Sequence, residues 1–157
     1  MTIMQHFRNN EVSVTRMTSD HLEAVAAIEV ECFAEPWSAK SLEMLLGASG
    51  IAFVVCAQGT VVAYAGMMTV LDEGQITNVA VSRNFRRLGY GRLVVEELIN
   101  YAKEHNFYNI SLEVRESNSA AISLYENCGF EKCGIRKSFY RFPSEDAVIM
   151  SKTFNTP

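Results

Sequence analysis

The sequence has no excess of positive charge: 18 aspartate and glutamate residues outnumber 14 lysine and arginine residues, which gives a formal net charge of −4. A protein whose main partner is nucleic acid usually carries a basic face, so direct binding to nucleic acid is not expected. The mild acidity instead suits a partner that is itself basic.

Histidine and cysteine are scarce and are not arranged as metal ligands. The three histidines are scattered, and the four cysteines show no CxxC or Cys/His ligand spacing. We therefore expect no metal site, and we expect thiols that stay reduced in a cytoplasmic protein. The cysteines are Cys32, Cys56, Cys128 and Cys133.

The sequence also lacks an uninterrupted hydrophobic run of membrane-spanning length. Residues 44–71 contain no charged side chain, but Gly47, Gly50 and a Gln58-Gly59 pair interrupt them. A membrane span needs about 20 predominantly apolar residues, whereas two buried strands around a turn explain this composition. The start, MTIMQHFRNN, is polar and lacks the apolar core of a signal peptide. No membrane association is expected.

Hydrophobic periodicity predicts seven strands and four helices in a chain whose 157 residues fit one domain. Their order is strand, two helices, three strands, helix, strand, helix and two strands. This order predicts a mixed sheet with helices on both faces and one strand–helix–strand crossover. The strands are expected at residues 12–17, 51–57, 61–71, 75–81, 108–114, 130–140 and 147–153.

Capping residues predict where the helices begin and end. Asp20 with Glu23 fits a capping box that opens the first helix, which runs to about residue 32. Ser38 can cap a short second helix, and Gly129 is suited to end the last one, over residues 118–127. The third helix is expected to run to about residue 105, with Val94, Val95, Leu98, Ile99 and Ala102 on its apolar face.

The stretch NFRRLGYGRL, residues 84–93, places two glycines and three arginines at the start of the third helix. Glycine is unfavourable inside helices, but the first turn of a helix has unpaired N–H groups and a partial positive charge. A glycine there lets a phosphate oxygen approach the backbone, and arginines add attraction. Residues 87–92 are therefore interpreted as a pyrophosphate cradle. The glycines are Gly89 and Gly91, and the arginines are Arg86, Arg87 and Arg92.

Other interpretations of this loop fit part of the pattern. Its glycines could simply turn the chain, because an isolated G-x-G is a weak signal. A Walker A loop is excluded because no Gly-Lys-Ser/Thr follows. A Rossmann fingerprint would use both glycines with Glu113, about 20 residues further on. Against it, Val94 occupies the third glycine position, the preceding strand ends near Val81, and no second βαβ unit follows.

The loop and the segments after it resemble a known family. The pattern R-x-x-G-x-G at residues 86–91, after the strand ITNVAV, resembles the acetyl-CoA motif of the GNAT N-acetyltransferases. The segment LEVRESNSAAISLYENCGF at residues 112–130, together with EPWS and EDAVIM, resembles the ribosomal-protein alanine N-acetyltransferases of the RimI type. The resemblance covers about residues 12–153, so residues 1–10 are expected to be an extension outside the family core.

The resemblance implies the α/β (α+β) GNAT fold, in which helices cover both faces of a central mixed, largely antiparallel seven-stranded sheet. It implies one such domain over residues 1–157. It also implies an enzyme of the cytoplasm that uses acetyl-CoA, needs no metal, and acetylates the α-amino group of a protein N-terminus. The expected acceptor is an N-terminal alanine of a small-subunit ribosomal protein.

The resemblance also implies roles for particular residues. Glu113 matches the family's general base, and Tyr125 matches its general acid. Backbone groups of Val79, Ala80 and Val81 would bind the pantetheine arm in the way that a strand edge accepts an added strand. The remaining cofactor contacts would come from Arg86, Arg87, Leu88, Gly89, Tyr90, Gly91, Arg92 and Asn118.

Acetylation of an α-amino group needs only a small set of catalytic residues. The pKa of an α-amino group lies near 7.7–8.0, so roughly a tenth is neutral at pH 7, whereas a lysine is neutral less than about one time in a thousand. One carboxylate, acting directly or through water, can then serve as the base. A backbone N–H near Val79 could stabilise the oxyanion. A tyrosine, with a pKa near 10, could protonate the leaving thiolate.

Each of these residues also has a purely structural interpretation. Glu113 falls on the polar side of its strand and could be a solvated surface residue. Tyr125 lies on an apolar helical stripe and could be a core tyrosine. Asn118 could be only the N-cap of its helix, or could both cap the helix and bind the cofactor.

Two other functions stay open. A GNAT enzyme with another acceptor, such as a small amine or a different protein N-terminus, is suggested by the RFPS connection between the last two strands. That connection is shorter than in the family members it resembles. The second is a non-catalytic acetyl-CoA sensor, against which the presence of both Glu113 and Tyr125 argues.

Overall fold

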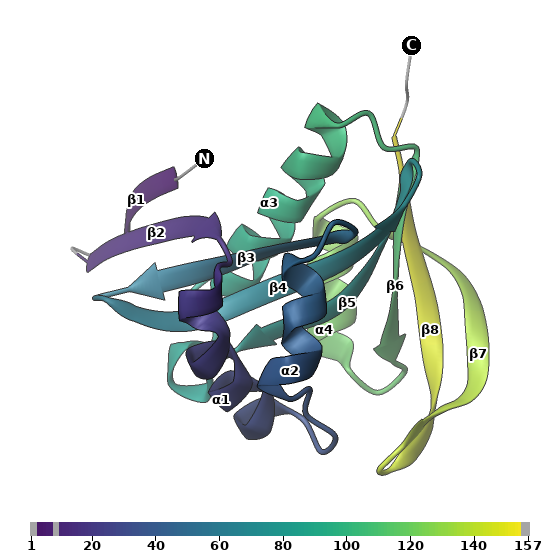
Figure 1. The fold of residues 1–157 in the computed structure, drawn as a ribbon. Helices are drawn as coiled ribbons and strands as arrows, with labels where there is room; N and C mark the ends of the chain where they lie inside the picture. The colour runs from purple at the N-terminus through teal and green to yellow at the C-terminus, as the bar shows by residue number, and fades with distance from the viewer. Residues whose placement is uncertain (1–2, 8–9, 155–157) are drawn as a thin grey trace.

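One sheet of eight strands runs through the structure, a computed structural model that describes residues 3–7 and 10–154 (Figure 1). The strands lie in the order β1-β2-β3-β4-β5-β6-β8-β7, and every neighbouring pair is antiparallel except β5 and β6. Their bounds are β1 Ile3–Phe7, β2 Asn10–Arg16, β3 Gly50–Ala57, β4 Thr60–Val70, β5 Glu73–Val81, β6 Asn109–Arg115, β7 Glu131–Arg141 and β8 Ser144–Thr153.

Helices cover both faces of the sheet, α1 and α2 on one face and α3 and α4 on the other (Figure 1). Within residues 3–7 and 10–154, no helix combines the length and the apolar character needed to cross a bilayer. The helices are α1 Leu22–Cys32, α2 Ala39–Leu42, α3 Tyr90–Glu104 and α4 Ser119–Asn127, with 3-10 turns at η1 Ser19–His21, η2 Glu43–Leu46 and η3 Arg83–Phe85.

The predicted fold, a mixed and largely antiparallel sheet with helices on both faces, is confirmed. The seven predicted strands correspond to β2 through β8. The eighth strand, β1, lies in the segment expected to fall outside the family core, and it pairs with β2 from Ile3–Val14 to Phe7–Asn10. The polar sequence of that segment carries no strand signal. An edge strand can be held by backbone pairing alone, so it does not need an alternating apolar pattern.

The helix ends agree with the predictions at three of four sites. Ser38 caps α2 by accepting the N–H of Ser41 at 3.1 Å, and Asn118 caps α4 through its Oδ1. Gly129 follows α4 with a φ of +94°, which glycine adopts without strain. The predicted Asp20/Glu23 capping box is wrong. The box is formed two residues earlier, where the N–H of Thr18 donates to His21 Nδ1 at 2.9 Å and a 3-10 turn precedes α1.

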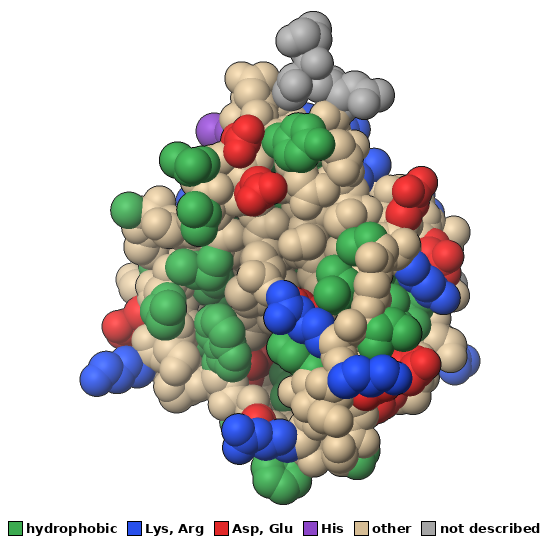
Figure 2. Space-filling view, turned by 90° about the vertical axis from the view of Figure 1, so that its right-hand side faces the viewer, with side chains coloured by type: hydrophobic (Ala, Val, Ile, Leu, Met, Phe, Trp, Pro, Cys, Tyr) green, Lys and Arg blue, Asp and Glu red, His purple; other side chains and the backbone are tan. Residues whose placement is uncertain are grey.

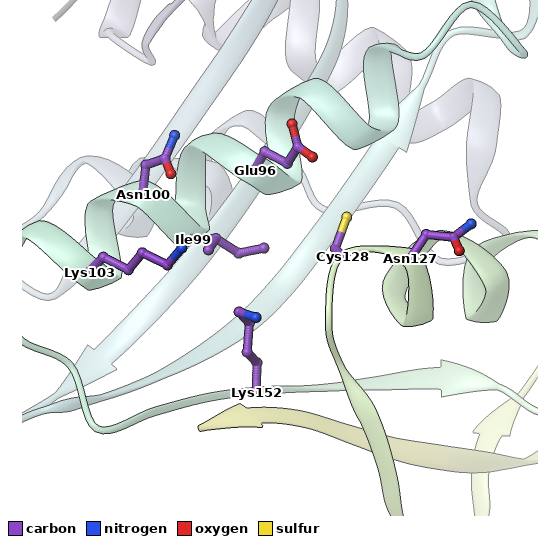
Figure 3. A pocket seen from close by; sticks show the side chains of 7 residues that line it. All are labelled: Glu96, Ile99, Asn100, Lys103, Asn127, Cys128 and Lys152. Atoms are coloured by element: carbon purple, nitrogen blue, oxygen red, sulfur yellow. The ribbon is translucent and has the colours of Figure 1, made fainter. Parts of the chain in front are cut away.

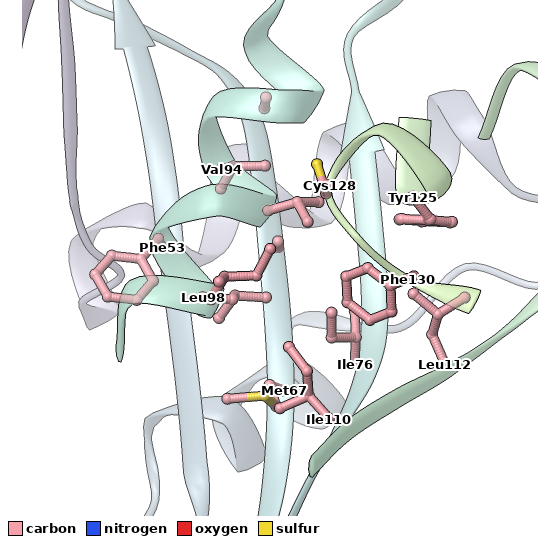
Figure 4. Packing of buried hydrophobic residues seen from close by; sticks show 14 of the residues in the cluster. Phe53, Met67, Ile76, Val94, Leu98, Ile110, Leu112, Tyr125, Cys128 and Phe130 are labelled. Atoms are coloured by element: carbon pink, nitrogen blue, oxygen red, sulfur yellow. The ribbon is translucent and has the colours of Figure 1, made fainter. Parts of the chain in front are cut away.

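Two hydrophobic layers hold the helices to the sheet. The predicted apolar face of α3 is buried, and Leu98 packs in one cluster with Phe53 and Met67 of the strands beneath it (Figure 4). A second cluster on the opposite face joins α1 and α2 to β3 and β4, with Val25 and Leu42 fully buried. The sheet is therefore anchored from both sides, and its strands are rigidly placed.

The sheet opens between its two parallel strands. β5 pairs with β6 only from Glu73–Asn109 to Gln75–Ser111. Beyond that point β5 continues along β4, with a bulge at Thr77, while β6 continues along β8 to Arg115. Figure 1 shows the two strands diverging. The backbone edges that face this opening are thus left without a neighbouring strand.

Candidate active site

The glycine loop lies at the start of α3, next to the end of β5. Gly89 is the N-cap of α3 with a φ of +87°, and an ideal Cβ built there would meet no described atom within 4 Å. The helical ladder begins with the bond from Leu93 N to Gly89 O at 3.0 Å. The amides of Gly91 and Arg92 therefore precede that ladder. The first turn presents N–H groups to an open surface, as an anion site requires.

The three arginines of the loop differ in their contacts. Arg86 is exposed, but its guanidinium is fixed by donating to Val81 O at 3.2 Å and to Cys32 Sγ at 3.4 Å. Arg92 pairs with Glu96 at 2.8 Å along the outside of α3. Among the described residues, Arg87 has neither a hydrogen-bond nor an ion-pair partner. Of the three side chains, Arg87 could therefore bind a ligand without first breaking a contact with a described residue.

The edge of β5 that faces the opening is defined by strand alternation. Ser82 N donates to Val62 O of β4 at 2.8 Å. Because backbone groups alternate in direction along a strand, those of Ala80 also point toward β4, whereas those of Val79 and Val81 point into the opening. The carbonyl of Val81 already accepts bonds from Cys32 and Arg86. Val79 is therefore the position whose N–H and C=O both face the opening.

Glu113 lies on β6, on the other side of the opening, and both of its carboxylate oxygens have partners. Gln75 Nε2 donates to Oε2 at 2.8 Å, across the point where β5 and β6 separate. Arg136 Nε lies 3.1 Å from Oε1. The Glu113 side chain is only 12% exposed. The interpretation of Glu113 as a solvated surface residue is therefore wrong.

Tyr125 lies on α4 and is buried at 7% exposure. Its ring packs edge-on against Phe130, with centroids 5.9 Å apart (Figure 4). Burial raises the pKa of Tyr125, and the neighbouring Tyr140 raises it further. The pKa of Tyr140 is itself raised to about 12, chiefly by burial, with Glu113 contributing in the same direction. The phenol of Tyr125 thus stays protonated at neutral pH.

The turn between β7 and β8 is fixed to the end of β6. Arg115 donates to the carbonyls of Phe142 and Pro143 and to Glu145 at 3.2, 2.9 and 3.2 Å, and its guanidinium lies 4.3 Å from the ring centroid of Tyr140. The N–H of Ser117 donates to Glu145 at 2.6 Å. The short RFPS connection is therefore held in one position beside the site.

A buried carboxylate lies behind β5, on the α1 side of the sheet. Glu29 is 1% exposed and accepts the hydroxyl of Tyr64 at 2.7 Å, the N–H of Trp37 at 3.0 Å and Asn78 Nδ2 at 3.4 Å. Burial is the main cause of a raised pKa at Tyr64, and the charge of Glu29 adds to it. These bonds connect α1, the loop after it, β4 and the bulged part of β5.

Two surface hollows lie apart from these residues. One, of about 210 Å³, lies between the C-terminal halves of α3 and α4 and the strand β8 (Figure 3). The other, of about 300 Å³, lies between α4 and the β7–β8 pair. Neither is lined by a residue predicted for the site. Figure 2 shows the β7–β8 side of the molecule, where basic, acidic and hydrophobic side chains are interspersed without forming one basic patch.

The sequence analysis identified the loop, Glu113, Tyr125 and Asn118 as candidate site residues. It did not identify three residues that lie beside them in the structure. Gln75, Arg136 and Tyr140 come from β5 and β7, and their roles follow from strand pairing that no local motif encodes. Asn118 is confirmed as a helix cap, and cofactor binding by it stays a prediction. Within the strand segment 79–81, alternation turns the backbone groups of Ala80 toward β4, so it offers none to the opening.

Comparison with known proteins agrees with this arrangement. Residues 22–130 match the acetyltransferase (GNAT) family. The chain is 36% identical over 141 residues to the [ribosomal protein bS18]-alanine N-acetyltransferase of Escherichia coli K12, covering 88% of this chain and 95% of that protein. It is 37% identical over 144 residues to the Salmonella typhimurium protein of the same name, with coverage of 90% and 96%.

A solved structure shares the fold. The crystal structure of the ribosomal-protein-S18-alanine N-acetyltransferase from Escherichia coli superposes with a TM-score of 0.87 at 34% identity, covering 93% of this chain and 96% of that one. Sequence, fold and the glycine loop at the opened sheet lead to one conclusion: this chain is a member of the GNAT family of acetyltransferases.

Proposed function

We propose that this protein transfers the acetyl group of acetyl-CoA to the N-terminal alanine of a ribosomal protein, namely bS18. Support comes from two relatives at 36% and 37% identity whose names state this activity and whose lengths match this chain almost fully. The observation that carries the proposal is the opened sheet, with the glycine loop at the end of β5 and Glu113 across from it on β6. Such an acceptor is found in the cytoplasm, where the four free cysteines would stay reduced.

The residues around the opening suit coenzyme A. Open space above Gly89 and the unpartnered guanidinium of Arg87 suit its diphosphate. The carbonyl of Val79 and the N–H of Val81, which face the opening, can pair with the amides of its pantetheine arm. The acetyl thioester would supply the activated carbonyl. We also propose that coenzyme A is contacted by the other residues from Arg86 through Arg92 and by Asn118.

The chemistry assigned to the chain is direct attack by the amine on the acetyl carbon. Glu113 accepts a proton from the attacking α-amino group, directly or through water. The N–H of Val79 donates to the carbonyl oxygen as negative charge builds on it. Tyr125 then gives its proton to the departing sulfur, and the C–S bond breaks as the new C–N bond is completed. Gln75 and Arg136 keep the base turned toward the opening.

A second candidate is transfer to another acceptor, either a different protein N-terminus or a small amine. It is favoured by the short β7–β8 turn that Arg115 and Glu145 hold in place beside the site. A non-catalytic acetyl-CoA sensor is the third candidate. It would bind the cofactor through the same loop and transfer nothing.

One assay separates these functions. The purified protein is mixed with acetyl-CoA and a peptide that begins with the N-terminal sequence of bS18, and release of free thiol is followed. The proposal predicts release with this peptide, and none when its α-amino group is blocked. Faster release with other N-termini or with small amines would favour the second candidate. Cofactor binding without release on any amine would favour the sensor.

A further inference from the structure

The C-terminal turn of α1 forms hydrogen bonds with the segment that leads into the glycine loop. The Glu31 carboxylate accepts the backbone N–H of Arg83 at 2.5 Å and the hydroxyl of Ser82 at 3.2 and 3.3 Å. In return, Arg83 Nη2 donates to the carbonyl of Glu31 at 3.0 Å. One residue later, Cys32 Sγ contacts Val81 O and Arg86 Nη2, both at 3.4 Å. Together these contacts fix residues 81, 82, 83 and 86 to the C-terminal turn of α1.

The conformation of this loop needs such outside support. Arg87 has a φ of +62°, a left-handed conformation that costs of order 1–3 kcal/mol in a residue other than glycine. Within residues 82–88, a single backbone–backbone bond is found, from Phe85 N to Ser82 O at 2.9 Å. Local bonds are therefore too few to define the path of the chain. The contacts from α1 supply what the loop lacks.

We propose that Glu31 is a positioning residue for the cofactor loop, which it holds in the conformation that presents the amides of residues 87–92. Glu31 is not one of the residues proposed to contact the reactants. Its carboxylate accepts the N–H of the first residue of η3, which fixes the start of the loop. This inference rests on the proposed binding of the coenzyme A diphosphate at that loop. Loss of the carboxylate lets the loop leave its binding conformation. The affinity for coenzyme A then falls in proportion to the fraction of molecules whose loop is still in that conformation.

The test compares Glu31→Ala with a matched control. Glu23→Ala removes an exposed glutamate of the same helix that, among the described residues, forms no hydrogen bond or ion pair with the loop. For Glu31→Ala we expect coenzyme A to bind about tenfold more weakly by calorimetry, in line with the loss of one charge-assisted hydrogen bond. The KM for acetyl-CoA should rise in parallel, while kcat stays within about twofold because the catalytic groups are untouched. Glu23→Ala should match the wild type.

A conservative variant separates positioning from general destabilisation. Glu31→Gln keeps an oxygen that can accept the N–H of Arg83 but loses the charge that strengthens this bond, so its affinity should lie between those of Glu31→Ala and the wild type. Thermal unfolding of each variant shows whether the fold is intact. Wild-type affinity in a folded Glu31→Ala would overturn the inference. If Glu31→Ala does not fold, Glu31→Gln decides: an affinity below that of the wild type supports the inference, and an equal affinity contradicts it.

Hydrogen exchange distinguishes failure of this inference from failure of the proposed function. Coenzyme A should protect the amides of residues 86–92 in the wild type, and Glu31→Ala should speed their exchange in the free protein. No protection by coenzyme A in the wild type would overturn both the cradle and the role of Glu31. Protection in both proteins with equal affinity would overturn the role of Glu31 alone.

Discussion

Arg136 Nε on β7 lies 3.1 Å from Glu113 Oε1 on β6, although β8 runs between the two strands. With Gln75 of β5 on the opposite oxygen, the carboxylate is held from both sides of β6. A base held in this way has one orientation, and an incoming amine meets it already aligned.

Replacing Arg136 by alanine should therefore lower activity more than stability. The arginine is 57% exposed, and exposed ion pairs contribute only about 0–1 kcal/mol. We expect kcat/KM to fall about five- to tenfold as the base loses its fixed orientation, with little change in thermal unfolding. Lys137→Ala is the control, because Lys137 lies next to Arg136 on β7 and forms another exposed ion pair, with Asp146 of β8. Equal losses in the two variants would contradict the role given to Arg136.

Glu113→Gln should cost about 100-fold or more in kcat/KM, the usual contribution of a general base. The loss should be largest at low pH, where the neutral amine is scarce and proton removal matters most. The check is a pH–rate profile on an alanine-initiated peptide for the wild type and the variant. Activity that is unchanged at every pH would show that another group, or water alone, takes the proton.

Tyr125→Phe should separate chemistry from binding. The phenylalanine ring can keep the edge-on packing against Phe130, so affinity for coenzyme A should stay within about twofold, whereas kcat should fall about 100-fold through loss of the acid. Calorimetry and steady-state rates measure the two quantities separately. If both decline together, the residue is structural.

Glu29→Ala should strongly destabilise the fold. It leaves the buried hydroxyl of Tyr64 and the N–H of Trp37 without their acceptor, and such losses cost about 2–4 kcal/mol in total. Urea unfolding measures the change. Val30→Ala, at a neighbouring position that is 68% exposed, should change the free energy of unfolding by less than about 0.5 kcal/mol. A Glu29→Ala protein as stable as the wild type would contradict the buried network.

The turn between β7 and β8 should depend on pH through Glu145. Bonds from Ser117, followed by Arg115, hold the pKa of Glu145 below its ordinary value of 4.5. A carboxyl whose pKa is lowered in the folded state adds stability above its unfolded pKa and loses it as the pH falls through the folded value. The stability difference between the wild type and Glu145→Gln should thus shrink below pH 4.5. A difference that stays constant from pH 7 to 3 would contradict this contribution.

The sequence was informative wherever a local pattern decides the structure. Alternation located seven strands, and the glycine spacing located the start of α3. It was uninformative where distant segments meet. The bond between Arg136 and Glu113 depends on β8 lying between β6 and β7, and Glu31 meets Arg83 because α1 packs beside the end of β5. The capping box was misplaced because a threonine–histidine pair replaces the usual serine–glutamate pattern.

The most direct test is a crystal structure of the protein with coenzyme A. The account predicts the diphosphate on the backbone amides of residues 87–92, the pantetheine arm along Val79, and the sulfur in the opening between Glu113 and Tyr125. Coenzyme A bound elsewhere, or a loop whose amides are blocked by neighbouring side chains, would contradict it.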